Sequence, residues 1–226
     1  MKNRPIAPLV WAALTLCAQT LCAQTLPAQA LPAQTVQAQA EITLFSEHTE
    51  TRVENLGEMT SSQRAGLEKF TRSRPYFGAI YIETQGNGWG SFTGAHNMKN
   101  AMELAERICN EYAKTDSCTL AGVVYPRDLD TKNIPALTMS AYAAEKFRIY
   151  SSRTEGFRAF ALSGNTAMGW ATRRDTPQEA VDAALTYCFT SSMKNLLKLQ
   201  PDLRAKAIDD GLYICRIIDA TRAAPS

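Results

Sequence analysis

One stretch of the chain decides the fold, NMKNAMELAERICNEY at residues 97–112, because its apolar side chains recur at steps of three and four residues. This spacing predicts an amphipathic helix that buries one stripe. A second stretch, TPQEAVDAALTYCFTS at residues 176–191, matches it 79 positions later. It opens with a capping threonine, a proline at the first helical position and a glutamate at the third, which predicts a capping box. The chain therefore contains two related helices, each with a cysteine near its end.

The segments before these two helices also match in the same order. Glu-Lys-Phe occurs at residues 68–70 and again at 145–147, an offset of 77. Residues 76–83 correspond to residues 156–163, and a tryptophan beside a glycine-rich turn recurs at an offset of 81. Four matching segments in one order predict an internal duplication.

The apolar runs that flank each long helix predict strands. We therefore expect an α+β fold made of two tandem helix-strand-strand-helix-strand repeats, with a mainly antiparallel sheet and helices packed on it. Residues 41–135 are expected to hold an N-terminal segment and repeat 1, and residues 136–226 repeat 2. Repeat 2 has an insertion at residues 192–210, where the sequence predicts an extra helical turn or two. This insertion is the clearest difference between the repeats and a candidate place for a function of its own.

The first 40 residues indicate export. Lys2 and Arg4 precede a short apolar run, which is followed by Ala-x-Ala tripeptides and low-complexity CAQTL and LPAQ units. This order is typical of a secretory signal peptide, and the run is shorter than the roughly 20 apolar residues of a membrane-spanning helix. We expect residues 1–40 to be a signal peptide and spacer, a periplasmic or secreted protein of the Gram-negative type, and no transmembrane anchor.

The charge balance argues against a nucleic-acid partner. Removal of residues 1–40 takes Lys2 and Arg4 from the 24 basic residues and leaves 22 against 22 acidic residues. A nucleic-acid-binding protein normally shows a basic excess. The expected partner is therefore an envelope protein or a small ligand.

Four cysteines follow the predicted signal peptide: Cys109, Cys118, Cys188 and Cys215. In an oxidising compartment an even number of cysteines predicts disulfides, and four cysteines allow three pairings. The internal repeat selects Cys109 with Cys118 and Cys188 with Cys215. Each bridge would then join the end of a long helix to the next strand.

Few residues suggest chemistry. His48 and His96 are the two histidines of the chain, and a zinc site needs three or four ligands at characteristic spacings, so no metal, cofactor or catalytic residue is expected. His96 precedes the long helix, where we expect a capping or surface residue, with a ligand contact as the alternative. Trp89 and Trp170, beside matching turns, are the other candidate ligand contacts because a tryptophan ring is wide and rigid. The alternative is that both rings pack over the hairpin onto the helix.

One pattern resembles a known family: Gly-Ala-Ile at residues 78–80, Trp-Gly at residues 89–90 and two spaced cysteines. It resembles an uncharacterised family of exported bacterial tandem-repeat domains, a domain of unknown function, over residues 76–125 and more loosely 156–220. The second copy departs from the pattern at Arg158 and in its longer cysteine spacing. Chains similar to this one are sometimes labelled aminolevulinic acid synthase. Such a pyridoxal-phosphate enzyme is about twice as long and is built around a Schiff-base lysine in a large α/β domain.

The sequence as a whole favours an exported, non-catalytic binding or interaction module of the cell envelope. The alternative is a secreted, hydrolase-like enzyme with an unrecognised site, in which a carboxylate acts with His96. An aminolevulinic acid synthase is the least favoured of the three functions.

Overall fold

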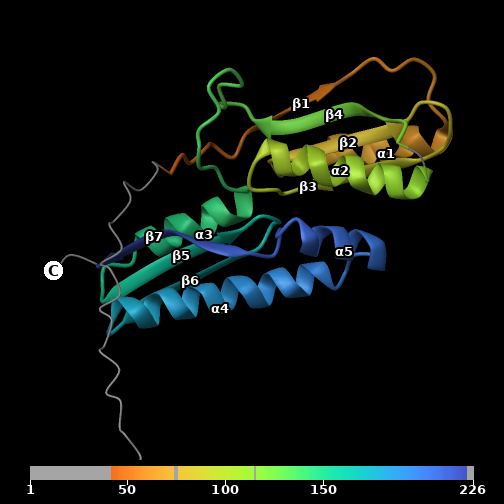
Figure 1. Cartoon of the computed structure of the whole chain (residues 1–226). Coiled ribbons are helices and arrows are strands. Elements are labelled where there is room, and N and C mark those ends of the chain that lie inside the picture. The colour runs from red at the N-terminus through yellow and green to blue at the C-terminus, as the bar shows by residue number, and fades with distance from the viewer. Residues whose placement is uncertain (1–41, 74–75, 115, 223–226) are drawn as a thin grey trace, which may run out of the picture. The chain divides into compact units, whose positions relative to one another are not determined.

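The structure is a computed structural model that describes residues 42–73, 76–114 and 116–222. The predicted signal peptide lies outside the described residues. The fold is α+β, as predicted, and we call residues 42–135 the first half and residues 136–222 the second half (Figure 1). The first half contains β1 (Thr49–Val53), α1 (Ser61–Arg72), β2 (Gly78–Glu83), β3 (Trp89–Thr93), α2 (Met98–Ala113) and β4 (Cys118–Pro126). The second half contains α3 (Ala141–Ser151), β5 (Phe157–Ser163), β6 (Met168–Arg174), α4 (Pro177–Leu196), α5 (Pro201–Asp209) and β7 (Cys215–Arg222).

The strands form two antiparallel sheets, one in each half. The first sheet has the order β1-β4-β2-β3 and the second the order β6-β5-β7. Helix α2 packs mainly on β2 and β3, and α4 packs on all three strands of the second sheet. Antiparallel sheets with helices packed on them are therefore confirmed, and the helix-strand-strand-helix-strand order occurs once in each half, with α5 added in the second.

Each sheet has a central strand that is buried on both faces. In β2, Ala79 and Tyr81 belong to the core shared with α2, whereas Ile80 and Ile82 belong to the core on the opposite face. In β5, small alanines face α4 and the larger Phe160 and Leu162 side chains lie in the core with α3. Because side chains alternate between the faces of a strand, a strand covered on both sides has the continuous apolar sequence seen here.

Polar side chains fix the start of four helices. The side chains of Thr60, Asn97, Ser140 and Thr176 each accept a hydrogen bond from the backbone N–H three residues later. Such caps satisfy backbone donors that have no partner within the helix. The box predicted at Thr176 is partial, because the Glu179 side chain accepts from the N–H of Asp175 and not from that of Thr176.

Two glycines set how closely the long helices approach the sheets. A Cβ atom at Gly90 would lie 2.2 Å from the backbone nitrogen of Cys109, and one at Gly169 would lie 2.2 Å from that of Cys188. Gly90 and Gly169 therefore take the same place in the two halves, at an offset of 79. The register that matched Trp89 with Trp170 at an offset of 81 is wrong by two residues.

The shorter helices also align differently from the sequence match. Their capping residues, Thr60 and Ser140, lie 80 positions apart. The shared Glu-Lys-Phe lies at the end of α1 but in the middle of α3. The offset of 77 is therefore wrong, and Tyr150 takes the buried place of Phe70.

Both predicted disulfides are present. Cys109 is bonded to Cys118 and Cys188 to Cys215, with sequence separations of 9 and 27 residues. Each bridge joins a long helix to the next strand along the chain, β4 in the first half and β7 in the second, as the repeat predicted. The longer separation in the second half holds the insertion, which extends α4 and adds the complete helix α5.

Candidate functional site

An apolar pocket of about 270 Å³ lies between helix α2 and the insertion. Its apolar wall comes from both halves of the chain and consists of Phe92, Leu104, Ile108, Leu196, Leu199, Leu203, Ala207 and Leu212. Small-molecule sites are typically concave and mostly apolar, with a few placed polar groups. The insertion at residues 192–210 therefore forms one wall of a cavity with the composition of a ligand site.

Helix α5 supplies this wall because the turn before it is held in place. Pro201 occupies the start of the helix, a position that suits its fixed φ angle. The Arg204 guanidinium donates hydrogen bonds of 2.9 to 3.2 Å to the carbonyl oxygens of Leu196, Leu197 and Leu199. These carbonyls lie at the end of α4 and in the turn that follows it, so Arg204 ties α5 to α4 and fixes the wall.

The polar edge of the pocket is formed by the β5–β6 turn. Asn165 is buried and donates through Nδ2 to the hydroxyl of Ser192 at 2.8 Å, and Asn195 donates to the hydroxyl of Thr166 at 3.0 Å. These bonds fasten the turn to α4. Lys198 also lines the pocket and is exposed, and it takes part in none of the ion pairs of the described residues.

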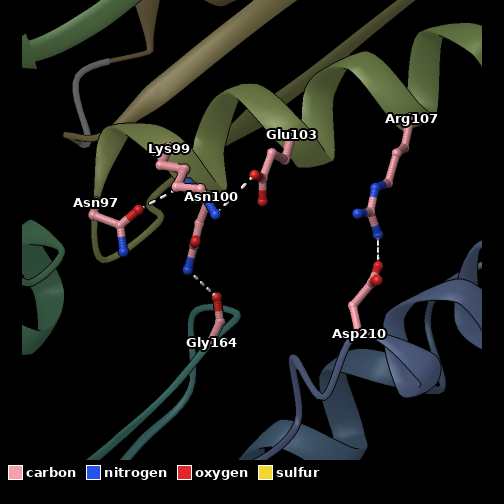
Figure 2. Close-up of polar contacts among 7 residues, drawn as sticks. All are labelled: Asn97, Lys99, Asn100, Glu103, Arg107, Gly164 and Asp210. Carbon is pink, nitrogen blue, oxygen red and sulfur yellow. Dashed lines mark hydrogen bonds and ion pairs between the residues drawn. The ribbon is translucent and has the colours of Figure 1, made fainter.

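A polar groove of about 620 Å³ adjoins the apolar pocket, since Arg107 and Leu212 line both cavities. Charged side chains from α2 line one side of the groove, and Asp210 and Arg216 lie on the other. Figure 2 shows the ion pair between Arg107 and Asp210, which stands at the junction of the two cavities. On α2 itself, Lys99 pairs with Glu103, with 3.0 Å between Nζ and Oε1.

Helix α2 is tied to the second half at its first turns as well. The Asn97 side chain caps the helix by accepting from the N–H of Asn100 at 2.8 Å. The Asn100 side-chain amide then donates to the carbonyl oxygen of Gly164 in the β5–β6 turn (Figure 2). Polar contacts from α2 thus hold both walls of the pocket and the groove together.

His96 is a buried structural residue in this arrangement, with 3% of its surface exposed. Its Nε2 lies 3.0 Å from the carbonyl oxygen of Ala167, and its Nδ1 accepts from the N–H of Ser140 at 3.2 Å. Burial lowers the pKa of the imidazole to about 4, although the bond to Ala167 favours the charged form. The capping or surface position expected for His96 is wrong, because Asn97 caps the helix. With both ring nitrogens bonded to backbone groups, His96 is not placed to act as a general base.

Both candidate tryptophans pack on the shorter helix of their half rather than on the long helix. The Trp89 ring lies against the backbone of Gly66 in α1, and its Nε1 donates to the hydroxyl of Ser62 at 3.2 Å. The Trp170 ring meets the Tyr150 ring of α3 edge-on, with centroids 6.5 Å apart. Neither tryptophan lines the apolar pocket or the polar groove.

The described residues contain no group of three or more His, Cys, Asp or Glu side chains placed to hold a metal ion. A pair of ionisable groups, the buried Tyr150 and the half-buried Asp219, lies between α3 and β7. Burial raises the pKa of Tyr150, and its hydrogen bond to Asp219 raises it further. The Arg158 guanidinium covers the Tyr150 ring, 5.1 Å from its centroid. This cluster fastens α3 to the sheet.

Sequence reasoning identified the insertion but missed the residues that face the pocket. Leu203 and Ala207 are buried on α5 at a spacing of four residues, which is the signal of a helix with one apolar face. The sequence predicted an extra helical turn or two at residues 193–199, and it did not assign residues 201–209 to a helix. The sequence analysis did not single out Leu104 on α2 either, although it lines the pocket.

The chain matches no protein-family model, and neither a curated protein nor a solved structure matches it significantly. In the part of the chain that the structure describes, no helix is long and apolar enough to cross a lipid bilayer.

Proposed function

We propose that this protein is an exported, non-catalytic binding module of the cell envelope that holds the apolar chain of a small anionic amphiphile in its apolar pocket. The observation that carries this proposal is the pocket of about 270 Å³ with eight apolar side chains in its wall. Its volume is slightly below the roughly 300 Å³ at which typical small-molecule sites begin. A single acyl chain therefore suits it better than a fused ring system.

The anionic head group follows from the polar surroundings of the pocket. Lys198 lines the pocket and has no partner among the ion pairs of the described residues. Arg107 stands where the pocket meets the polar groove, although Asp210 neutralises it. A carboxylate or phosphate on the ligand would therefore form an ion pair with Lys198 without breaking an existing ion pair.

Export and duplication belong to the same proposal. Two disulfides are consistent with an oxidising compartment outside the cytoplasm. A tandem duplication is supported by the equal offset of 79 between Gly90 and Gly169 and between the capping residues Asn97 and Thr176. The insertion was then added to the second copy only, where it forms the pocket together with the first copy.

The test uses the predicted mature chain, residues 41–226, with two probes: decanoate below its micellar concentration and decan-1-ol below its aqueous solubility. Calorimetry or NMR titration should show saturable binding of decanoate. Ala207→Phe fills the pocket from its wall and should weaken decanoate binding by tenfold or more, which corresponds to about 1.4 kcal/mol. Ala205→Phe is the matched control, because residue 205 lies on the exposed side of the same helix.

The Lys198→Glu variant distinguishes the contribution of the head group to binding from that of the apolar chain. This change should weaken decanoate binding and leave decan-1-ol binding unchanged. Equal affinity of the Ala207→Phe and Ala205→Phe variants would contradict the pocket as the site, and absence of saturable binding by either probe would contradict the amphiphile.

A further inference from the structure

In the part of the chain that the structure describes, strand β7 has a free edge where its counterpart in the first sheet, β4, is paired. β4 lies between β1 and β2, whereas β7 stands at the end of the three-stranded sheet (Figure 1). Among the described strands, β5 is the one partner of β7. A strand at the edge of a sheet presents unpaired N–H and C=O groups and is a template for another chain.

The two cysteine-bearing strands, β4 and β7, have the same pairing geometry. β4 pairs antiparallel with β2 and β7 with β5, and each pairing has one register shift. The shift leaves one extra residue on each of these strands, Ala121 in β4 and Ile218 in β7. Each strand also begins with a cysteine bonded to the long helix. The edge of β7 is therefore shaped like the edge of β4 that accepts β1.

The extra residue does not prevent strand addition. β1 pairs with the part of β4 that follows it, from Gly122 to Pro126. The corresponding part of β7 begins at Asp219 and continues through Ala220 and Thr221. An incoming strand thus has a described stretch of β7 to pair with beyond the irregularity.

In the second half, the chain that would supply this strand forms a turn. The capping residues of α1 and α3, Thr60 and Ser140, lie 80 positions apart. At this offset, residues 129–133 correspond to strand β1. There the N–H of Asn133 donates to the carbonyl oxygen of Asp130 at 3.2 Å, and the Asn133 side chain donates to the Asp130 carboxylate at 2.7 Å. This segment connects β4 to α3, and it is not a strand.

β7 lacks two of the usual protections of a sheet edge. Proteins protect edges with lysine, proline, bulges or inward-pointing charges, and β7 contains neither lysine nor proline. Its bulge is the one that β4 also has beside a paired strand. Asp219 points inward toward α3, but the Tyr150 hydroxyl donates to its carboxylate, so this charge already has a partner within the second half.

We propose that the edge of β7 at residues 219–221 binds an extended segment of a partner protein, which adds antiparallel as a fourth strand in the way that β1 adds to β4. In this mode main-chain hydrogen bonds provide the affinity and side chains the specificity. The surface is distinct from the apolar pocket and does not depend on its ligand.

The partner segment carries a carboxylate at the end nearest Arg216. Arg216 is exposed and takes part in none of the ion pairs of the described residues. In the first half, Glu54 follows β1, and its N–H donates to the carbonyl oxygen of Ala121 at 2.9 Å. An acidic residue at this position of the incoming strand would lie beside Ile218 and approach Arg216.

The test adds such a strand to the mature chain. A copy of residues 48–54, HTETRVE, is appended after Ser226 through a glycine-serine linker, so that it can fold back along β7 at high effective concentration. Hydrogen exchange is then measured by NMR for the amides of residues 219–221. Those that point away from β5 should exchange about tenfold more slowly than in the unmodified chain, and the melting temperature should rise.

Two matched controls isolate strand pairing. In the first, two adjacent prolines replace the residues of the appended copy that correspond to Thr51 and Arg52, which removes a donor facing β7 in either register. This variant should show no protection. In the second, Arg216→Glu should reduce the protection given by the unaltered appended copy.

Each result decides the proposal. Protection that requires the proline-free copy supports a free edge that accepts a strand. No added protection would overturn it. If the unmodified chain already protects these amides at every concentration, its own N-terminal segment covers the edge, and if dilution removes the protection together with a dimer seen by light scattering, a second copy does. Either result would overturn the partner strand.

Discussion

The backbone of Gly90 lies so close to that of Cys109 that a side chain at residue 90 would meet the helix backbone itself. A Cβ atom there would stand 2.2 Å from the nitrogen of Cys109, and a Cβ atom at Gly169 would stand 2.2 Å from the nitrogen of Cys188. Because the obstacle is backbone in a disulfide-bonded helix, it cannot move aside as a flexible side chain would. The two glycines thus set the spacing between each long helix and its sheet.

Gly90→Ala and Gly169→Ala should each lower the free energy of unfolding by about 3 kcal/mol or more, as overpacking against backbone does. Urea unfolding followed by circular dichroism measures the change. Gly94→Ala is the control, because residue 94 has a φ of 78° but nothing within 4 Å of its Cβ position. That variant should lose about 1 to 2 kcal/mol from the left-handed conformation alone. A similar loss in all three would show that close packing is not the cause.

The element order and both disulfides could be predicted because they depend on local patterns: apolar spacing, capping residues and the place of each cysteine. The register between the halves could not, because it depends on which glycine meets a helix. The prominent tryptophans suggested an offset of 81, whereas Gly90 and Gly169 give 79. His96 was expected to cap the helix or lie at the surface, because its bonds to Ala167 and Ser140 involve residues far away in the sequence.

Much of the candidate site was also beyond sequence reasoning. The insertion was recognised as a difference between the repeats, yet the pocket exists because Leu203 of the insertion faces Leu104 across the two halves. A periodic pattern shows that a helix has an apolar face, but it does not identify the surface that this face meets.

The two disulfides should stabilise the fold unequally. The loop-entropy relation gives about 2.5 kcal/mol for the Cys109–Cys118 bridge and about 3.5 kcal/mol for the Cys188–Cys215 bridge, since their separations are 9 and 27 residues. Replacing both cysteines of a bridge with alanine, followed by denaturant unfolding, measures each value. A larger loss from the shorter bridge would contradict the entropic account. Peptide mapping without reduction should recover these two pairs and no link between the halves.

The free energy of unfolding should fall as the pH decreases from 7.5 to 4. The pKa of His96 is lowered to about 4 by burial, while an unfolded histidine has a pKa of about 6.5. Between these values the unfolded chain binds a proton that the folded chain does not, so the stability present near neutral pH is lost on acidification, by about 3 kcal/mol at pH 4.

His96→Gln keeps a donor and an acceptor but does not titrate in this range, so its stability should vary less with pH than that of the natural chain. His48→Gln is the control, because His48 is exposed. Denaturant unfolding at several pH values measures both variants. Equal pH dependence in His96→Gln and the natural chain would show that another group causes the effect.

The ion pair between Arg107 and Asp210 should contribute little by itself to joining α2 and the insertion. Its side chains are 33% and 41% exposed, and pairs this accessible contribute about 0.5 kcal/mol in double-mutant cycles. Arg107→Ala, Asp210→Ala and the double variant should give a coupling free energy of that size, which decreases with added salt. The Lys99–Glu103 pair lies within α2 and provides the comparison, because its loss cannot weaken a contact between the halves. A coupling above about 2 kcal/mol for Arg107 and Asp210 would show that this pair, rather than the apolar wall and the His96 bonds, holds the pocket closed.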